Sequence, residues 1–89
     1  MSVINNTAAN RFELNVDGHI AFADYLLDGR VLVIPHVEAP AELRGTGAAG
    51  KLMEGVVEAA RSANQRIRPL CSYAAAWIKR HPEHHDLLA

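Results

Sequence analysis

The sequence predicts an α/β (α+β) fold with a mostly antiparallel sheet of about four strands, two main helices and one parallel pair of strands. Two dipeptides typical of tight hairpins, Asp17-Gly18 and Asp28-Gly29, separate three apolar segments in the first half of the chain. A glycine-rich stretch at residues 44–49 then opens a long amphipathic segment. Because strand–helix–strand units place their strands parallel, the strand after this segment should pair in parallel with the third strand.

The first two strands are predicted from alternating polarity. The buried set of the first strand is expected to be Phe12, Leu14 and Val16. Glu13 alternates with this set and falls on the solvent side. For the second strand, residues 19–27, the buried set is expected to be Ile20, Phe22 and Leu26 or their neighbours. Residues 1–10 are mostly polar, and we expect them to be flexible.

The third strand, residues 30–38, is rich in valine, leucine and isoleucine. Pro35 interrupts it and predicts a bulge or an unpaired edge, because proline has no N–H to donate to a neighbouring strand. The first helix is expected over residues 48–63, where apolar residues recur at helical spacing. A short strand at residues 66–70 and a second helix at residues 72–81 complete the order.

Composition limits the function classes. A chain of 89 residues fits one domain, residues 1–89, and a net charge of −1 argues against nucleic acid as the main partner. The single cysteine, Cys71, excludes an internal disulfide and suits a reducing compartment. No apolar segment is long enough to span a membrane, and the N-terminus lacks a signal-peptide pattern. We therefore expect a cytoplasmic monomer or weak homodimer with no membrane partner.

The stretch Arg44–Ala49 carries the main functional signal. A glycine-rich turn that enters a helix leaves backbone N–H groups unpaired, and the helix dipole adds positive charge there. The two effects together favour phosphate oxygens. A turn that only packs strand and helix closely remains the simplest alternative.

A nucleotide-binding P-loop is a second interpretation, because Gly45 to Lys51 match G-x-x-x-x-G-K. Leu52 then stands where a P-loop has Ser or Thr to hold magnesium. No apolar strand ending in Asp follows to complete such a metal site. These departures disfavour ATP or GTP as the ligand.

A third interpretation is a pyrophosphate seat for coenzyme A. Arg44–Ala49 fits the pattern [Q/R]-x-x-G-x-[G/A], and the chain resembles the GNAT superfamily of acetyl-CoA-dependent N-acetyltransferases, which carries this signature. Three further blocks resemble a short single-domain GNAT-like subfamily with a Pro-x-Cys-Ser-Tyr motif. They are His-Val-Glu-Ala-Pro at residues 36–40, Pro-Leu-Cys-Ser-Tyr at 69–73 and Ile-Lys-Arg-His-Pro-Glu at 78–83.

The resemblance covers nearly the whole chain, from Phe12 to Leu88. It implies a trimmed GNAT fold without the usual N-terminal helices, in which the parallel strand pair splays apart to admit the cofactor. It also implies acetyl-CoA or coenzyme A as cofactor and an amine as acceptor. The chain departs from the subfamily at Val37 and Ala39, where Thr and Val are frequent.

By this resemblance the cofactor-binding residues form two groups. One group joins the end of the third strand to the glycine-rich turn, and the other is the cysteine. They are Val37, Glu38, Ala39, Arg44, Gly45, Thr46, Gly47, Ala48, Ala49, Gly50 and Cys71. The catalytic candidates are Glu38 and Cys71. No metal is expected.

Glu38 is the candidate base that takes the amine proton, with a plain surface glutamate as the alternative. His36 lies two residues earlier on the same strand face and could hydrogen-bond with it, although a structural histidine is the favoured interpretation. Cys71 is either an acyl-accepting nucleophile or a residue that lines the thiol pocket. A lone cysteine is otherwise most often a small buried apolar side chain.

Other residues carry weaker signals. Tyr73 could protonate the leaving thiolate, as a tyrosine on this helix does in many GNATs, but core packing is favoured. Trp77 stands where the subfamily often has Tyr, and its indole is a poor acid. The histidines at 81, 84 and 85 have no metal-binding motif and favour a solvated turn. The rival function is a non-catalytic coenzyme A or acyl-CoA binding module.

Overall fold

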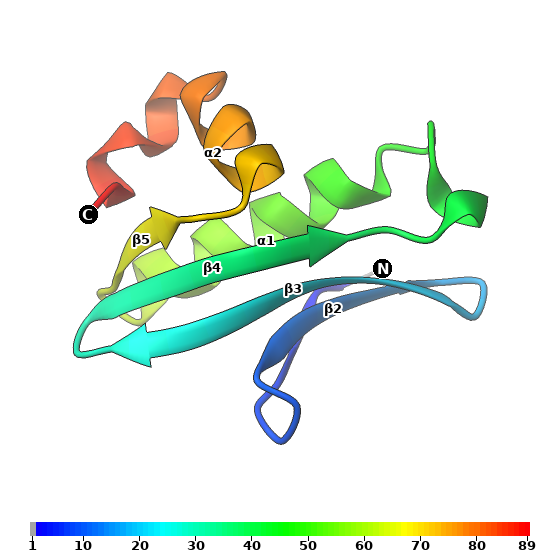
Figure 1. Cartoon of the computed structure of the whole chain (residues 1–89), viewed down its shortest axis with the longest axis horizontal. Coiled ribbons are helices and arrows are strands. Elements are labelled where there is room, and N and C mark those ends of the chain that lie inside the picture. The colour runs from blue at the N-terminus through cyan, green and yellow to red at the C-terminus, as the bar shows by residue number, and fades with distance from the viewer. Residues whose placement is uncertain (1) are drawn as a thin grey trace.

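The computed structural model describes residues 2–89, and Met1, part of the stretch expected to be flexible, lies outside the described residues. Five strands form one sheet in the order β1-β2-β3-β4-β5, and two α-helices pack against it (Figure 1). The strands are β1 (Ile4–Asn6), β2 (Arg11–Val16), β3 (His19–Asp28), β4 (Val31–Glu38) and β5 (Arg66–Pro69). The helices are α1 (Ala48–Ser62) and α2 (Ser72–Lys79), with short 3₁₀ helices at Ala41–Leu43 and Pro82–Leu87.

The sheet follows the predicted topology. Strands β1 to β4 form an antiparallel meander, and β5 pairs in parallel with β4 after the α1 crossover. Both predicted hairpins form, and Gly18 and Gly29 take positive φ angles of 86° and 60° in their turns. The register between β3 and β4 shifts between Asp24 and Leu26, opposite Pro35, so the predicted bulge is present.

The sheet has five strands rather than about four, because residues Ile4–Asn6 add β1 to the edge of β2. These residues lie in the stretch expected to be flexible. Side-chain contacts hold them: the Tyr25 hydroxyl donates to Asn5 Oδ1 at 2.8 Å, and Asn6 Nδ2 donates to Glu13 Oε2 at 3.1 Å. A strand of three residues is too short to show a recognisable alternation of polar and apolar side chains.

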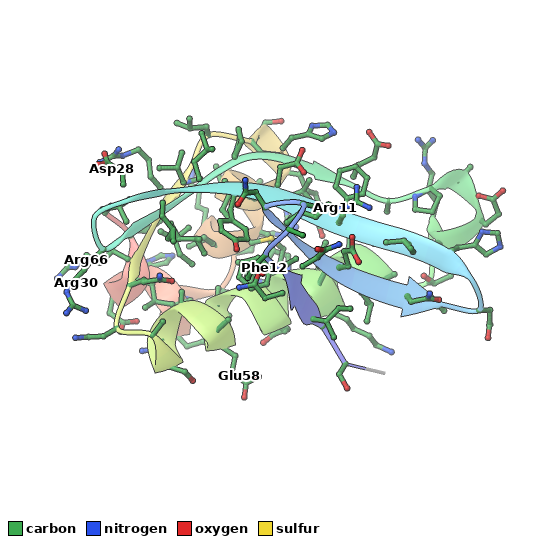
Figure 2. All side chains as sticks on the ribbon, turned by 90° about the horizontal axis from the view of Figure 1, so that it is seen from below. Arg11, Phe12, Asp28, Arg30, Glu58 and Arg66 are labelled. Carbon is green, nitrogen blue, oxygen red and sulfur yellow. The ribbon has the colours of Figure 1, made fainter. Side chains whose placement is uncertain are left out.

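One face of the sheet and both helices enclose a single apolar core (Figure 2 shows α1 along that face). On β3 the buried residues are Ala21, Ala23 and Tyr25. They are the sequence neighbours of Ile20, Phe22 and Leu26, so the second of the two expected alternatives holds. The larger Ile20 and Leu26 point to the other face and are 37 % and 60 % exposed. Small side chains on β3 leave room for α1 to approach the sheet.

Glu13 points away from the core, as alternation predicts, yet it is only 9 % exposed. Arg11 Nε donates to its carboxylate at 2.6 Å, and the Arg11 guanidinium also lies 4.5 Å from the centre of the Phe22 ring. The hydrogen bonds from Arg11 and then Asn6 lower the pKa of Glu13 below its ordinary value. The helix-free face thus carries a covered ion pair rather than a freely solvated carboxylate.

Candidate active site

The glycine-rich turn lies between the end of β4 and the start of α1. Gly45 and Gly47 have positive φ angles of 77° and 81°, so glycine suits both positions, and Gly47 is the N-cap of α1. Thr46 stabilises the turn, since its hydroxyl donates to the Leu43 carbonyl at 2.5 Å and accepts from the Ala48 N–H at 3.3 Å. The turn is therefore held in place by its own hydrogen bonds.

The turn uses some of its own N–H groups. The N–H groups of Arg44 and Thr46 donate to the carbonyls of Ala41 and Leu43. Within residues 2–89, four N–H groups of this segment have no hydrogen-bond acceptor: those of Gly45, Gly47, Ala49 and Gly50. These four are the donors that an anion could take at the N-terminus of α1.

The P-loop interpretation does not fit this geometry. Leu52 is fully buried in the core, so its position contributes nothing to a magnesium site. The Thr46 hydroxyl is already bonded to the Leu43 carbonyl. The turn offers backbone N–H groups alone, which suits an anion without a bound metal.

Strands β4 and β5 separate before the chain reaches this turn. Their pairing ends at Ile34 and Pro69, whereas β4 continues to pair with β3 as far as Glu38. The Ile34 carbonyl accepts the N–H groups of both Leu70 and Cys71 at 3.0 Å. Beyond Ile34, the β4 edge that faces β5 has no partner strand within the described chain, so the expected splay is present.

Cys71 is the residue at which the chain turns from β5 into α2. It is half-buried, is a free thiol and packs against the apolar core. Tyr73 is also partly buried, and burial raises the pKa of its phenol above its ordinary value. Trp77 is 4 % exposed and stacks on His81 with ring centres 3.9 Å apart, so it is a packing residue.

Glu38 lies on the opposite face of the sheet from Cys71. Val37 pairs with the buried Ala23 and packs toward the core, so its neighbours His36 and Glu38 point the other way, beside Phe22. His36 Nε2 donates to Glu38 Oε1 at 3.0 Å, and both side chains are more than half exposed. His36 is thus a surface partner of Glu38 rather than a structural histidine, a role that its spacing of two residues had signalled.

The predicted residues fall on different sides of the separated ends of β4 and β5, a region we call the gap. The glycine-rich turn and the free β4 edge border it, Cys71 lies on the core side, and the Glu38–His36 pair lies on the helix-free side. No hydrogen bond joins Glu38 to Cys71 within residues 2–89. Any joint action of the two must go through a molecule in the gap.

The C-terminal histidines contact the end of α2. His81 Nδ1 donates to the Trp77 carbonyl at 2.6 Å, and His85 Nε2 donates to the Ile78 carbonyl at 3.0 Å. Each of these carbonyls also accepts a backbone N–H, from Arg80 and His81 respectively, so the imidazoles add a second donor at the end of the helix. The role of these side chains is to cap a helix.

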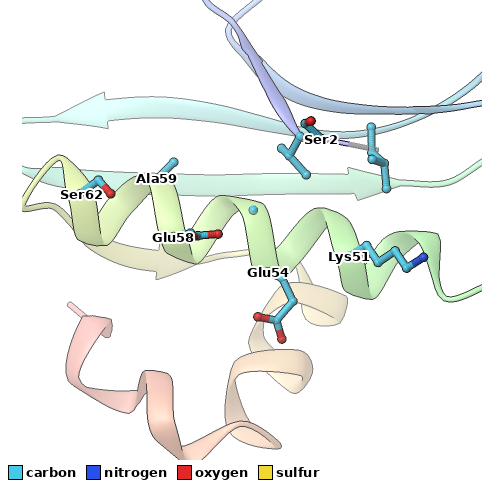
Figure 3. A pocket seen from close by; sticks show the side chains of 9 residues that line it. Ser2, Lys51, Glu54, Glu58, Ala59 and Ser62 are labelled. Atoms are coloured by element: carbon cyan, nitrogen blue, oxygen red, sulfur yellow. The ribbon is translucent and has the colours of Figure 1, made fainter.

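A hollow with a volume of about 590 Å³ lies away from the gap, between the N-terminal segment and α1 (Figure 3). Its rim includes Lys51, Glu54 and Glu58 of α1 and Ser2 of the N-terminal segment. None of the predicted catalytic residues lines it. No helix within residues 2–89 combines the length and apolar character that a bilayer crossing needs.

Comparison with known proteins decides the family. The model of the GCN5-related N-acetyl-transferase family matches residues 11–87. The chain belongs to this family. A search of curated proteins found no match.

A solved structure agrees with this assignment. The fold is similar to the NMR solution structure of a GCN5-like candidate N-acetyltransferase from Staphylococcus aureus, with a TM-score of 0.73 and 30 % sequence identity. The match covers 90 % of this chain and 81 % of the other. The fold is therefore the GCN5-related N-acetyltransferase fold, with a five-stranded sheet.

Proposed function

We propose that this member of the family binds acetyl-CoA and transfers the acetyl group to an amine. One observation carries the proposal: within residues 2–89, four N–H groups without an acceptor stand at the start of α1, near the end of β4, whose edge toward β5 has no partner strand there (Figure 1). The first feature suits the pyrophosphate of coenzyme A, and the second suits its amide-bearing pantetheine arm. A single ligand that carries both a pyrophosphate and amide groups could bind the two features at once.

The glycine-rich turn holds the phosphate end. The N–H groups of Gly45, Gly47, Ala49 and Gly50 would donate to pyrophosphate oxygens, and the α1 dipole favours their negative charge. Without a side chain at Gly45 or Gly47, nothing lies within 4 Å of where a Cβ would stand, so the backbone is open to a ligand. Arg44 adds a cation beside the turn.

The β4 edge orients the arm. Peptide groups at Val37 to Ala39 would pair with the amides of pantetheine as a neighbouring strand would. An arm on this edge brings its sulfur end toward Cys71, which is held at the point where the strands separate. Bound acetyl-CoA supplies an activated acetyl thioester.

Glu38 would take the proton of the attacking amine, directly or through water. It lies on the helix-free face, so the acceptor would approach from the side opposite Cys71. His36 would hold the Glu38 carboxylate in position through its 3.0 Å hydrogen bond. Tyr73, whose phenol pKa is raised by burial, would give a proton to the departing thiolate.

Calorimetry with acetyl-CoA, coenzyme A and Mg-ATP tests the binding step. We expect both coenzyme A forms to bind and ATP not to bind, and ligands that bind should raise the melting temperature. Binding of none of the three would reduce the turn to a packing feature and overturn the proposal.

Glu38→Gln tests the catalytic step, with Glu83→Gln, on the C-terminal 3₁₀ helix, as the matched control. With a panel of amines, Glu38→Gln should lower kcat/KM about 10²-fold or more while the affinity for coenzyme A stays the same. The control should match the wild-type protein. Cofactor binding without any acetyl transfer in the wild type would instead indicate a binding module.

A further inference from the structure

A second hollow of about 520 Å³ lies at the other end of the β4–β5 pair from the glycine-rich turn. It is formed where β4 begins, where α1 ends and where β5 begins. Its polar lining consists of Arg30, Arg61, Asn64, Gln65, Arg66 and Asp86. The eight residues of β4 separate it from the turn by about 23 Å, at about 3.3 Å per residue. The proposed acetyl-CoA site does not use it.

The hollow is strongly basic although the whole chain has a net charge of −1. Three guanidinium groups line it against one carboxylate, Asp86. Arg61 is bonded to both oxygens of Asp86, at 2.7 and 3.2 Å, so this pair largely neutralises itself. The excess positive charge comes from Arg30 and Arg66.

Arg30 and Arg66 have no carboxylate partner within residues 2–89. Arg30 Nη1 contacts the Asn64 carbonyl at 3.5 Å, and Arg66 Nη1 contacts the Leu88 carbonyl at 3.4 Å, both long hydrogen bonds. Each guanidinium has five N–H donors, so most of them remain free. Figure 2 shows both side chains projecting from the same end of the sheet.

The backbone around these arginines is well held. The Arg66 N–H donates to the Arg30 carbonyl at 2.8 Å, which holds the first residue of β5 against the turn residue that precedes β4. The Gln65 N–H donates to the Ala60 carbonyl at 2.8 Å, and Asn64 adopts a positive φ of 59° in the turn after α1. Arg30, just before β4, and Arg66, at the start of β5, thus form a pre-arranged pair of planar donors.

We propose that this hollow is a second anion site, which binds the dianionic phosphate group of a small molecule. The two free guanidinium groups match a phosphate dianion in charge, and each can donate to two of its oxygens. The side-chain amides of Asn64 and Gln65 add neutral donors at the same rim. This site binds through side chains, whereas the glycine-rich turn offers backbone N–H groups.

The test is a titration of the ¹⁵N-labelled chain with inorganic phosphate at constant ionic strength, with NMR detection of arginine Nε–Hε and backbone N–H signals. We expect saturable shifts at Arg30 and Arg66 and at the amides of Asn64 and Gln65. Acetate serves as the monoanion control, and its titration should give an affinity at least tenfold lower than that of phosphate. Equal shifts with acetate, or phosphate shifts confined to residues 44–50, would overturn the proposal.

Variants connect the shifts to the arginines. Arg30→Gln with Arg66→Gln should weaken phosphate binding at least tenfold, and Arg80→Gln, an exposed arginine at the end of α2, should leave it unchanged. The single Arg30→Gln variant gives the same test if the double variant does not fold. Unchanged phosphate affinity in a folded Arg30→Gln protein would disprove the site. Because calorimetry with coenzyme A can be repeated on the Arg30→Gln variant, which keeps the glycine-rich turn, either proposal can fail without the other.

Discussion

The Cys71 N–H donates to the Ile34 carbonyl at 3.0 Å, which ties the start of α2 to the last residue at which β4 and β5 pair. The parallel ladder ends here because the chain leaves β5 at Pro69 and turns into α2 at Ser72. This bond holds the one thiol of the chain at the mouth of the gap between the two strands. The position of Cys71 is thus set by backbone hydrogen bonding together with the packing of its side chain against the apolar core.

Cys71→Ala should reveal whether the thiol reacts or only lines the gap. Within residues 2–89 no side chain hydrogen-bonds to Cys71 Sγ, and an adjacent base usually activates a nucleophile. We therefore expect kcat/KM for acetyl transfer to fall by about tenfold or less, equivalent to about 1.4 kcal/mol. Mass spectrometry should find no acetylated protein during turnover. A loss near a thousandfold, or a trapped acetyl-cysteine, would establish covalent catalysis instead.

Gly47→Ala should destabilise the protein because of backbone strain alone. Its φ angle is +81°, and no atom lies within 4 Å of the position that a Cβ would take. A left-handed residue with a side chain costs about 1–2 kcal/mol, and urea denaturation would measure the change. Gly50→Ala is the matched control: its Cβ would meet Trp77 Nε1 at an ordinary 3.6 Å, so we expect no loss of stability. Equal losses in both variants would contradict the strain argument.

Gly55→Ala should disturb the N-terminal strand. Val3 occupies the space that a Cβ at position 55 would need, so the added methyl forces Val3 to move. Overpacking of this kind costs about 1–3 kcal/mol, and hydrogen exchange at β1 should become faster. Adding Val3→Ala to the variant should restore part of the lost stability. If exchange at β1 is unchanged in Gly55→Ala, the segment does not pack on α1 as described.

The Glu13 carboxylate should make stability depend on acidity. The hydrogen bond from Arg11 is the main cause that lowers the pKa of Glu13 in the folded protein. The ionised carboxylate therefore stabilises the fold at a pH above the pKa that Glu13 has in the unfolded chain. That contribution is lost as pH falls from about 5 through the lowered folded pKa. Urea denaturation between neutral and acidic pH should show a smaller decline for Glu13→Gln. Arg11→Gln should flatten the curve in the same direction, and an unchanged decline in both would exclude the pair as the cause.

Local chemistry accounts for what could be predicted. Asp17-Gly18 and Asp28-Gly29 each form a turn within a few residues, and Pro35 disrupts pairing because of its own ring. Gly45 and Gly47 take positive φ angles, which the local geometry of the turn requires. Alternation placed Glu13 on the outer face, but it carried no information about the arginine that covers it.

Sequence by itself determined the order of elements, the parallel pair and the family resemblance, because hairpin turns, periodicity and short motifs act over neighbouring residues. Tertiary structure alone decided that residues Ile4–Asn6 add a strand, that Glu38 and Cys71 lie on opposite faces, and that Arg30 meets Arg66. These relationships join residues far apart in the chain. They depend on strand register and on which face each side chain takes, and a shift of one residue would reverse them.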